Sequence, residues 1–408
     1  MESAINEDIV IVGAGIAGLS TALGLHRLGI RSLVLEWSES LRNTGFALTM
    51  WTNAWRALDA VGVGDILREK SLQIQGFQVS SWNSSLPSSV KAPEADLKPE
   101  KFESRCLRRK DLLETLEREL PQGAIRYSSK IVSIEESGIF KLVHLSDGSV
   151  FRAKVVIGCD GVNSMVAKWL GLENPVSAGR SAIRGFVVYP NGHGFEPKFH
   201  AYFGAGLRCG FMPCSDKSLY WFCTFNPSVF NYDDNEHNPL KIKQFVLSNI
   251  SNAPEHILDM VERTTLDCIS CAPLKLRLPW DILRKNIVKN NVCVAGDALH
   301  PMTPDIGQGG SSALKDSIVL ARCLAESLLT GNEKDEEDYV KMERGLKKYE
   351  KDRRWISFNL ITTSYVVGLI QESDGKVMSF LKKKFLSKYT MGALVTMADF
   401  DCDKLIVS

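Results

Sequence analysis

Three glycines near the start of the chain have the spacing of a turn that binds phosphate groups. Gly13, Gly15 and Gly18 follow a β-branched run, residues 9–12, that predicts a buried strand, and they lead into a segment with helical spacing. Gly13 permits a tight turn, Gly15 lets a pyrophosphate approach the backbone, and Gly18 lets the helix pack closely on the strand. The free N–H groups at the start of that helix also favour a negatively charged phosphate.

The residues that follow extend this turn into a βαβ unit. The helix ends at Gly29, and residues 32–35 predict a second strand that is closed by Glu36. A carboxylate about twenty residues beyond the glycines can accept hydrogen bonds from the diol of a ribose. An ordinary βαβ turn explains neither the glycine spacing nor Glu36, so the pattern predicts a nucleotide site whose turn also contains Ala17.

Two later strands also end beside a glycine and an aspartate. Residues 154–157 and 291–295 predict buried strands, which are followed by Asp160-Gly161 and Gly296-Asp297. Asp160-Gly161 taken alone is typical of an ordinary turn. Together with the first glycine turn, these two pairs give three strand ends with motifs of this kind. They predict a ligand site, because ligands bind at the carboxyl edge of a parallel sheet.

Other candidate residues have ordinary explanations when they are taken singly. Arg109 alone would be a solvated helix charge, Asp316 alone would be a surface acid, and a lone histidine such as His300 is more often structural than catalytic. Only the joint order of the motifs along the chain favours a functional interpretation.

The hydrophobic pattern between the motifs predicts an α/β chain. Helical spacing occurs over residues 52–67, 105–120, 241–250, 311–329 and 335–358. Strand-like segments occur over residues 73–82, 125–127, 131–135, 141–145 and 149–153. Residues 183–272 are rich in aromatics, alternation and turns, which predicts a mainly antiparallel sheet in a separate domain.

The composition limits the function classes. With 408 residues the chain can form two or three domains, and 49 basic against 48 acidic residues give no electrostatic reason to expect nucleic acid. No apolar run approaches the roughly twenty residues that cross a bilayer, and the first strand begins too early for a targeting signal. We therefore expect a soluble cytoplasmic protein without stable membrane insertion.

The ten cysteines are scattered, which favours reduced thiols in an intracellular compartment. Cys268 and Cys271 form a CxxC pair, but no second pair or histidine cluster lies nearby in the sequence. A zinc or redox site is therefore not expected there.

With these motifs in place, the chain resembles the class A flavoprotein monooxygenases, the family of para-hydroxybenzoate and salicylate hydroxylases, and within it the plant FAD-dependent monooxygenases. The resemblance runs from Asp8 to near Arg354. It is carried by residues 8–36, 108–112, 158–161, 295–301 and 307–310.

The resemblance implies a Rossmann-like FAD-binding domain, an inserted substrate domain with a mixed or antiparallel β-sheet, and C-terminal helices. Residues 1–70, 101–180 and 291–345 would form the FAD-binding domain, 71–100 and 181–290 the substrate domain, and 346–408 the C-terminal helical region.

The resemblance also assigns cofactor-binding roles. The first glycine turn would hold the adenosine end of FAD, Asp297 would face the ribityl hydroxyls and the pyrophosphate, and Arg109 would donate to phosphate or ribityl oxygens. Asp160 and Gly161 resemble a family motif tied to FAD and to reduced nicotinamide. The expected cofactor-binding residues are Gly13, Gly15, Ala17, Gly18, Glu36, Arg42, Gly45, Arg109, Asp160, Gly161, Gly296, Asp297, Pro304, Gly307, Gln308, Gly309 and Gly310.

The reaction implied by the resemblance is the hydroxylation of a small aromatic, phenolic substrate. NADPH or NADH would reduce FAD, O2 would add at flavin C4a, and the hydroperoxide would transfer one oxygen to the ring. The cofactor performs this chemistry, so we expect no catalytic side chain and no metal in the protein. The expected assembly is a monomer or a weak homodimer.

One strand is the candidate substrate wall. Residues 218–224 alternate, so Tyr220, Phe222 and Thr224 share one face. In this family a strand of the middle domain lies above the flavin, which makes these three residues candidate substrate contacts, and core packing is an equally good explanation of each.

Two other functions are compatible with the same motifs, a non-catalytic carrier on the same fold and another flavin oxidoreductase. A second nucleotide turn at residues 204–210 is not expected, because Cys209 stands where the third glycine is required.

Residues 376–388 interleave lysines with apolar residues at near-helical spacing. We expect this segment to pack on the FAD-binding domain rather than on a membrane, because its apolar stretch is short.

Overall fold

The structure is a computed structural model of the chain. It describes residues 4–42, 46–81, 103–204, 206–233, 237–329, 337–372 and 405. Gly45 and the segment 376–388 lie outside these described residues.

The first sheet has eight strands in the order β16-β17-β10-β1-β2-β7, with β9 and β8 continuing from β10. Strands β1, β10, β17, β2 and β7 run parallel. The bounds are β1 Ile5–Val12, β2 Leu33–Leu35, β7 Ile125–Arg126, β8 Ile131–Ser137, β9 Phe140–Leu145, β10 Val150–Gly158, β16 Val288–Lys289 and β17 Val292–Val294. The carboxyl-terminal parts of β1 and β10 contain fully buried β-branched runs, residues 9–11 and 155–157, as a sheet covered on both faces requires.

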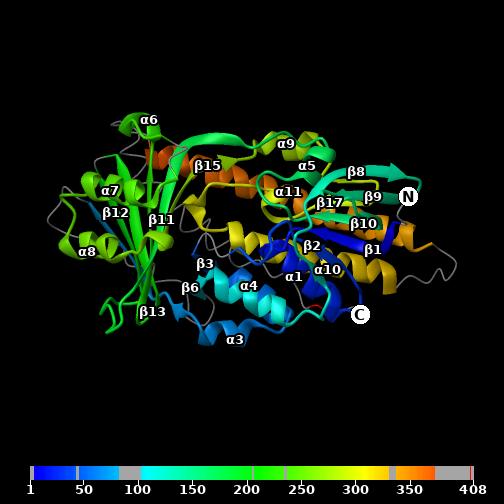
Figure 1. Cartoon of the computed structure of the whole chain (residues 1–408), viewed down its shortest axis with the longest axis horizontal. Coiled ribbons are helices and arrows are strands. Elements are labelled where there is room, and N and C mark those ends of the chain that lie inside the picture. Colours follow the sequence, from blue (N-terminus) through cyan, green and yellow to red (C-terminus); the bar gives the residue numbers. More distant parts are fainter. Residues whose placement is uncertain are drawn as a thin grey trace.

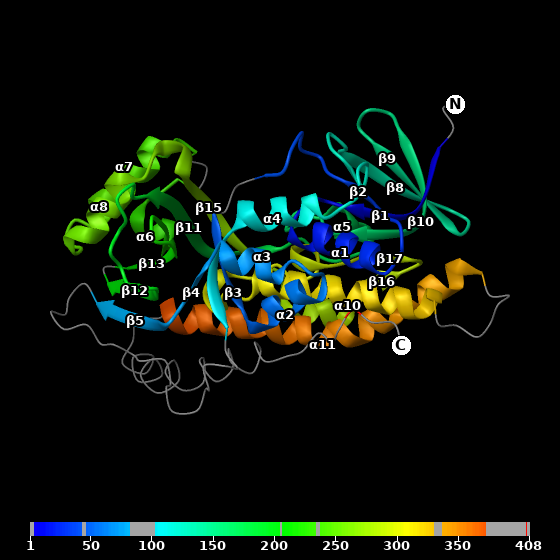
Figure 2. The same cartoon turned by 90° about the horizontal axis from the view of Figure 1, so that it is seen from below.

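Helices cover this sheet and fill the space beside it. Helix α10 packs along α1 and along α11, and Figure 2 shows α11 running beside α10 through most of the length of the molecule. The helices of this part are α1 Ile16–Arg27, α2 Thr52–Ala60, α3 Gly64–Glu69, α4 Arg109–Arg118, α5 Met165–Trp169, α9 Pro279–Arg284, α10 Gly309–Leu329 and α11 Asp338–Glu372, with 3-10 turns η3 Gly296–Ala298 and η4 Pro304–Ile306.

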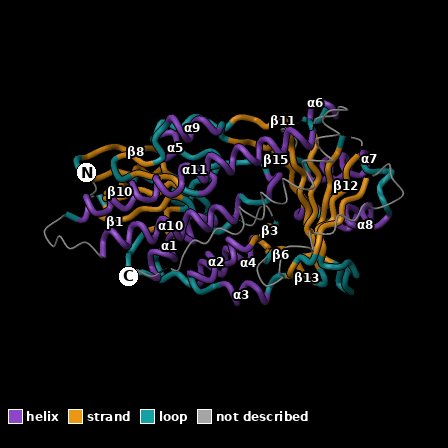
Figure 3. Tube along the Cα trace, turned by 180° about the vertical axis from the view of Figure 1, so that it is seen from behind, coloured by secondary structure: helices purple, strands orange, loops and turns teal. Residues whose placement is uncertain are grey.

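The second sheet has six strands in the order β15-β11-β14-β13-β12-β5 and stands at the opposite end of the molecule (Figure 1). Its neighbours are antiparallel except for the parallel pair β12–β5. Helices α7 and α8 cover its outer face, as Figure 3 shows from behind. The bounds are β5 Gly76–Ser81, β11 Val176–Val188, β12 Lys198–Gly204, β13 Leu207–Ser215, β14 Ser218–Phe225, β15 Ile269–Leu276, α6 Pro227–Phe230, α7 Pro239–Asn249, α8 Glu255–Arg263 and the 3-10 turn η2 Leu266–Cys268.

A third, three-stranded sheet joins the two halves. Its order is β3-β6-β4, and its bounds are β3 Ala47–Trp51, β4 Leu72–Gln73 and β6 Ser104–Arg108. One buried cluster combines Ala47 and Cys106 of this sheet with Phe186, Met212 and Tyr220 of the six-stranded sheet. The inner face of the six-stranded sheet therefore packs on β3 and β6.

The α/β architecture expected from the sequence is confirmed, but three element predictions were wrong in detail. Residues 104–108 form strand β6, so the helix expected from Arg105 begins only at Arg109. The helix expected over 52–67 is two helices, because Gly62 adopts a left-handed conformation with φ +80°. The last helix extends to Glu372 instead of ending at Phe358.

Gly204 ends β12 and residues 207–210 lie on β13, which pairs with β12 in an antiparallel register; this agrees with the rejection of the segment as a nucleotide turn. In the part of the chain that the structure describes, no helix is long and apolar enough to cross a membrane.

Candidate functional site

The carboxyl ends of four parallel strands meet at one level of the sheet. Val12 pairs with Leu35 and with Gly158, and Gly158 pairs in turn with Val294. The residues that follow these strand ends are the predicted motifs: the turn at 13–18, Glu36, Asp160-Gly161 and Gly296-Asp297. The strand register alone therefore brings together residues that are almost 300 positions apart in the sequence.

The first turn has space for a ligand at only one of its three glycines. A Cβ on Gly13 would lie 2.6 Å from the carbonyl oxygen of Cys159, and a Cβ on Gly18 would lie 1.9 Å from the carbonyl oxygen of Gly13. A Cβ on Gly15 would meet nothing within 4 Å. Gly13 and Gly18 thus serve packing, whereas Gly15 borders open space at the start of α1, where helix N–H groups favour anions.

Glu36 is held against this turn. It is buried, its Oε2 accepts a hydrogen bond from the backbone N–H of Ala14 at 2.7 Å, and its Oε1 accepts one from Ser38 at 3.0 Å. Each carboxylate oxygen can accept a second hydrogen bond, so Glu36 can fix the turn and still accept from a ribose. Arg42 is exposed and lies 4.9 Å above the ring of Trp37.

The Asp160 carboxylate is directed into the protein. Its Oδ1 accepts a hydrogen bond from the Ser164 hydroxyl at 2.5 Å, and its Oδ2 accepts one from the N–H of Met165 at 2.7 Å. Asp160 therefore caps the first turn of α5 and shapes the loop. Gly161 has a left-handed backbone, and a Cβ there would meet nothing within 4 Å.

The turn at Gly296 is held by a buried charge network. Asp316 accepts hydrogen bonds from the N–H of Gly296 at 2.8 Å, from Nε2 of His300 at 2.6 Å and from Nε of Arg353 at 2.6 Å. All three side chains are fully buried. The interpretation of Asp316 as a surface acid was therefore wrong, and no local sequence pattern indicates Arg353 on the distant helix α11. Asp297 itself is exposed.

Burial opposes ionisation of Asp316, but its attraction to Arg353 and His300 and their hydrogen bonds outweigh this effect. Together they hold the pKa of Asp316 well below its usual range. The network therefore contains a carboxylate at every ordinary pH.

Arg109 lies at the start of α4, beside this sheet edge. Burial lowers the pKa of its guanidinium, the nearby Asp297 carboxylate raises it, and the like charges of Arg42 and Arg184 lower it further. Its Nε is buried without a hydrogen-bond partner among the described residues. A buried charged donor without a partner is costly, which makes Arg109 suited to an anionic ligand.

The loop 304–310 leads into helix α10 and contacts Trp51 and Asn53. Gly307 has a left-handed backbone, and its carbonyl accepts a hydrogen bond from Nε1 of Trp51 at 2.9 Å. Gln308 is buried, with Oε1 bonded to Asn53 at 3.1 Å and with Nε2 unpartnered within the described part of the chain. Pro304 begins η4, and Gly309 and Gly310 open helix α10.

The buried Arg180 and the partly buried Arg208 connect this loop to the six-stranded sheet. Asp305 accepts two hydrogen bonds from Arg180 at 3.0 and 2.7 Å and one from Arg208 at 2.8 Å. Burial raises the pKa of Asp305, but the hydrogen bonds from Arg180 and the charges of both arginines hold it below its usual range. This ion pair was not among the sequence-based candidates, although Asp305 lies within the predicted loop.

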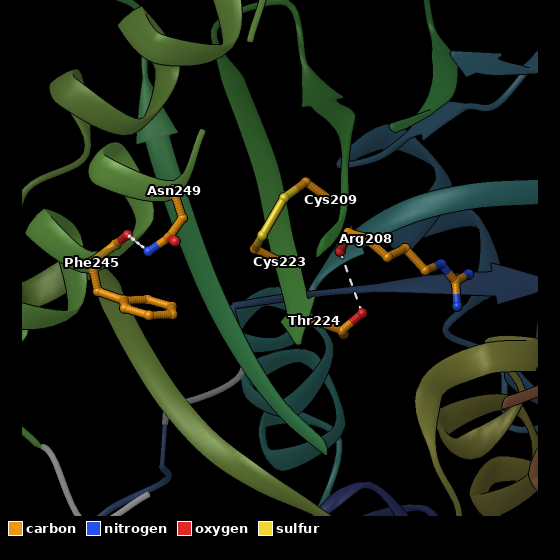
Figure 4. Close-up of a disulfide and its surroundings, with 6 residues drawn as sticks. All are labelled: Arg208, Cys209, Cys223, Thr224, Phe245 and Asn249. Carbon is orange, nitrogen blue, oxygen red and sulfur yellow. Dashed lines mark hydrogen bonds between the residues drawn. A yellow bond between two sulfur atoms is a disulfide. The ribbon is translucent and has the colours of Figure 1, made fainter. Parts of the chain in front are cut away.

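Two of the three predicted wall residues join an aromatic surface on the inner face. Tyr220 and Phe222 lie 6.4 Å apart between ring centroids and belong to the cluster that packs on β3 and β6. The hydroxyl of Thr224 instead donates to the backbone carbonyl of Arg208 at 3.3 Å (Figure 4).

Three further rings extend this surface toward the loop 304–310. Phe199 lies 6.0 Å from Phe222, Phe77 lies 5.8 Å from Phe199, and Trp51 stacks on Phe77 at 6.2 Å. We call Tyr220, Phe222, Phe199, Phe77 and Trp51 the aromatic wall. Trp51, Phe77 and Phe199 were not among the residues predicted from the sequence, where the alternation of their strands was the only available signal.

The outer face of the same sheet contains a disulfide. Cys209 of β13 is bonded to Cys223 of β14, facing α7 and therefore away from the aromatic wall (Figure 4). The expectation of reduced thiols was wrong for this pair. Among the described residues, no group of three or more His, Cys, Asp or Glu side chains could hold a metal ion.

A parallel sheet with a glycine turn, an acid after the second strand and a helix-opening loop defines a dinucleotide-binding protein. Comparison with known families specifies the class: the model of the FAD binding domain family matches residues 6–362. The chain belongs to this family and is a FAD-dependent monooxygenase of the class A type.

Similar proteins are found in plants and bacteria. Monooxygenase 2 of Arabidopsis thaliana is 51% identical over the full length of both chains, and Monooxygenase 1 of the same plant is 35% identical over 97% of this chain and 99% of that one. Among solved structures, Klebsiella pneumoniae HpxO complexed with FAD and uric acid has a TM-score of 0.76 and 19% identity, covering 98% of this chain and 96% of that one.

Proposed function

We propose that this FAD-dependent monooxygenase uses NADPH or NADH and O2 to hydroxylate a small, planar aromatic substrate that lies against the aromatic wall. The observation that carries the proposal is the unbroken series of ring contacts from Tyr220 to Trp51, which ends at the carbonyl of Gly307. Aromatic faces favour stacked or edge-to-face partners, and this surface adjoins the loop assigned to the cofactor.

The residues present fit FAD. Among the described residues, the backbone at Gly15 borders open space, and Nε of Arg109 and Nε2 of Gln308 have no hydrogen-bond partner. A long anionic group could therefore approach the backbone at Gly15 and accept hydrogen bonds from these two donors. In this proposal the turn at Gly13 and Glu36 hold the adenosine end, Arg109 and Asp297 bind the middle of the cofactor, and the loop 307–310 adjoins the flavin. The bound flavin supplies the redox and oxygen chemistry.

The protein itself orients the substrate and excludes water. Phe199 and Phe222 are only partly buried, so they can contact a ligand. Arg180 and Arg208 fix Asp305 and thereby hold the loop 304–310 against the six-stranded sheet. The hydroxylation needs two contributions from the protein: it must hold the substrate ring in one orientation, and it must exclude water from the site.

Purification and turnover test the proposal. The protein should contain oxidised flavin, and an added phenolic substrate should stimulate NADPH or NADH oxidation and yield a product that carries one oxygen atom from labelled O2. A panel of phenols, N-heteroaromatic compounds and aliphatic controls defines the substrate class. Turnover of only aliphatic compounds, or flavin reduction without oxygen incorporation for every compound, would reject the hydroxylase assignment.

Replacement of Arg109 by methionine should weaken FAD binding by about 10- to 150-fold, because a charged hydrogen-bond donor contributes roughly 1.5–3 kcal/mol. Titration of the apoprotein with FAD measures this effect. Lys110→Met is the matched control, since Lys110 is the next residue on α4 and is exposed. Equal FAD affinities of the two variants would show that Arg109 does not contact the cofactor.

Replacement of Phe222 by alanine should raise the Michaelis constant for the aromatic substrate about 10-fold and lower the fraction of reductant that yields product. Phe245→Ala is the matched control, because Phe245 is also a partly buried phenylalanine but packs on Phe225 at the outer face. If both variants keep the wild-type Michaelis constant and coupling, the substrate does not lie on Phe222.

A further inference from the structure

Two cysteines from different sheets meet at the contact between the halves of the molecule. Cys106 lies on β6 and Cys214 on β13, 108 positions apart, with their Sγ atoms 2.8 Å apart. Both are free thiols and are buried to 1% exposure or less. A disulfide bond is about 2.05 Å long, so a shift of less than ~1 Å would bring these sulfur atoms to bonding distance.

The surroundings of this pair are apolar and lie close to the candidate site. Cys106 and Cys214 belong to the cluster that contains Met212 and Tyr220. Strand β6 continues directly into Arg109 at the start of α4. A bond between the two sulfur atoms would therefore tie the strand that positions Arg109 to the sheet that carries the aromatic wall.

We propose that Cys106 and Cys214 form a reversible disulfide when the protein meets hydrogen peroxide. One sulfur attacks the O–O bond, which breaks to give a sulfenic acid and one water molecule. The second sulfur then displaces the hydroxyl group, forming the S–S bond and releasing a second water molecule. The two thiols lose two electrons and two protons, and one peroxide is reduced to two waters.

Burial sets the rate and the persistence of this reaction. It raises the pKa of Cys106 well above the usual value, so the more reactive thiolate is scarce and oxidation is slow. The same burial slows the reduction of the bond by external thiols once it has formed, without preventing it. Cys323 is equally buried, but its sulfur lies 4.0 Å from the Asp352 carboxylate and provides a matched control.

Peptide mapping tests the proposal on the full-length FAD-bound protein. After incubation with hydrogen peroxide, the protein is unfolded in a denaturant that contains N-ethylmaleimide, which alkylates the remaining free thiols. It is then digested without reduction. A cross-linked peptide containing Cys106 and Cys214 should appear and should vanish after reduction. The control variant Cys323→Ala should still give this peptide. Cys106→Ala and Cys214→Ala should each lose it, so the test needs only one of these two variants to fold.

Thermal unfolding gives a second readout. A bond that closes a loop of this length should raise the unfolding midpoint by roughly 5 °C, and the reductant should reverse the rise. Complete alkylation of both cysteines after peroxide treatment would overturn the proposal, as would their separate oxidation to sulfinic acids. The mapping requires no turnover, so its result is independent of the proposed substrate.

Discussion

Alanine at position 15 is expected to prevent FAD binding while leaving the protein folded. Gly15 has ordinary backbone angles, φ −80° and ψ −171°, and a Cβ there would meet no atom of the described residues within 4 Å. The methyl group would occupy the space through which the pyrophosphate approaches the backbone. Gly15→Ala should therefore weaken FAD binding at least about 100-fold, or ~2.7 kcal/mol, with an unchanged thermal midpoint of the apoprotein.

Alanine at position 18 is the matched comparison, because it should lower the stability of the fold itself and not only the affinity for FAD. Its Cβ would lie 1.9 Å from the backbone carbonyl oxygen of Gly13, and a backbone atom cannot move aside as a flexible side chain can. Gly18→Ala should destabilise the apoprotein by about 3 kcal/mol or more. Circular dichroism melts of both apoproteins together with FAD titrations separate the two effects. Tight FAD binding by Gly15→Ala would show that the cofactor does not cross this turn.

Asp316→Ala should be among the most destabilising single substitutions in the chain. The change leaves the Arg353 guanidinium fully buried without its carboxylate and frees the N–H of Gly296. Removal of one partner of a buried ion pair costs about 3–5 kcal/mol. Because Gly296 begins the turn that carries Asp297, FAD binding should also weaken. Chemical unfolding and FAD titration measure the two effects.

A second substitution tests the cause of this loss. Arg353→Met in the Asp316→Ala background removes the uncompensated charge and should recover at least about 1 kcal/mol of the lost unfolding free energy. Glu350→Met, one turn earlier on α11 and more exposed, should recover nothing. No recovery with Arg353→Met would mean that the stranded charge is not the origin of the instability.

The acid stability of the wild-type protein should depend on the same carboxylate. The native pKa of Asp316 is lowered, so its contribution to stability is complete above the unfolded-state pKa of about 4. It is lost as the pH falls from there toward the lower native value. An Asp316→Ala variant should therefore show a smaller loss of unfolding free energy than the wild type between about pH 5 and pH 2.

The sequence by itself determined the elements with local signals. The turn at Gly13–Gly18 could be predicted because its glycines, strand and helix are adjacent in the chain, and Glu36 follows at a fixed distance. The α/β class and most helices followed from hydrophobic periodicity. The strand β6 was wrongly predicted as part of a helix because it continues directly into α4. No change in the pattern of polar and apolar residues marks the end of this short strand before Arg109.

Only the tertiary structure decided which distant residues act together. Asp316 looked like a surface acid because its burial depends on packing between α10 and α11, and its partner Arg353 is 37 positions away. The aromatic wall draws rings from β3, β5, β12 and β14, and the pair Cys106–Cys214 joins two sheets. Periodicity assigns a residue to a face of its own element, but it contains no information on which other element covers that face. Strand order and helix docking supply that information, because they arise from burial of apolar surface summed over the whole chain.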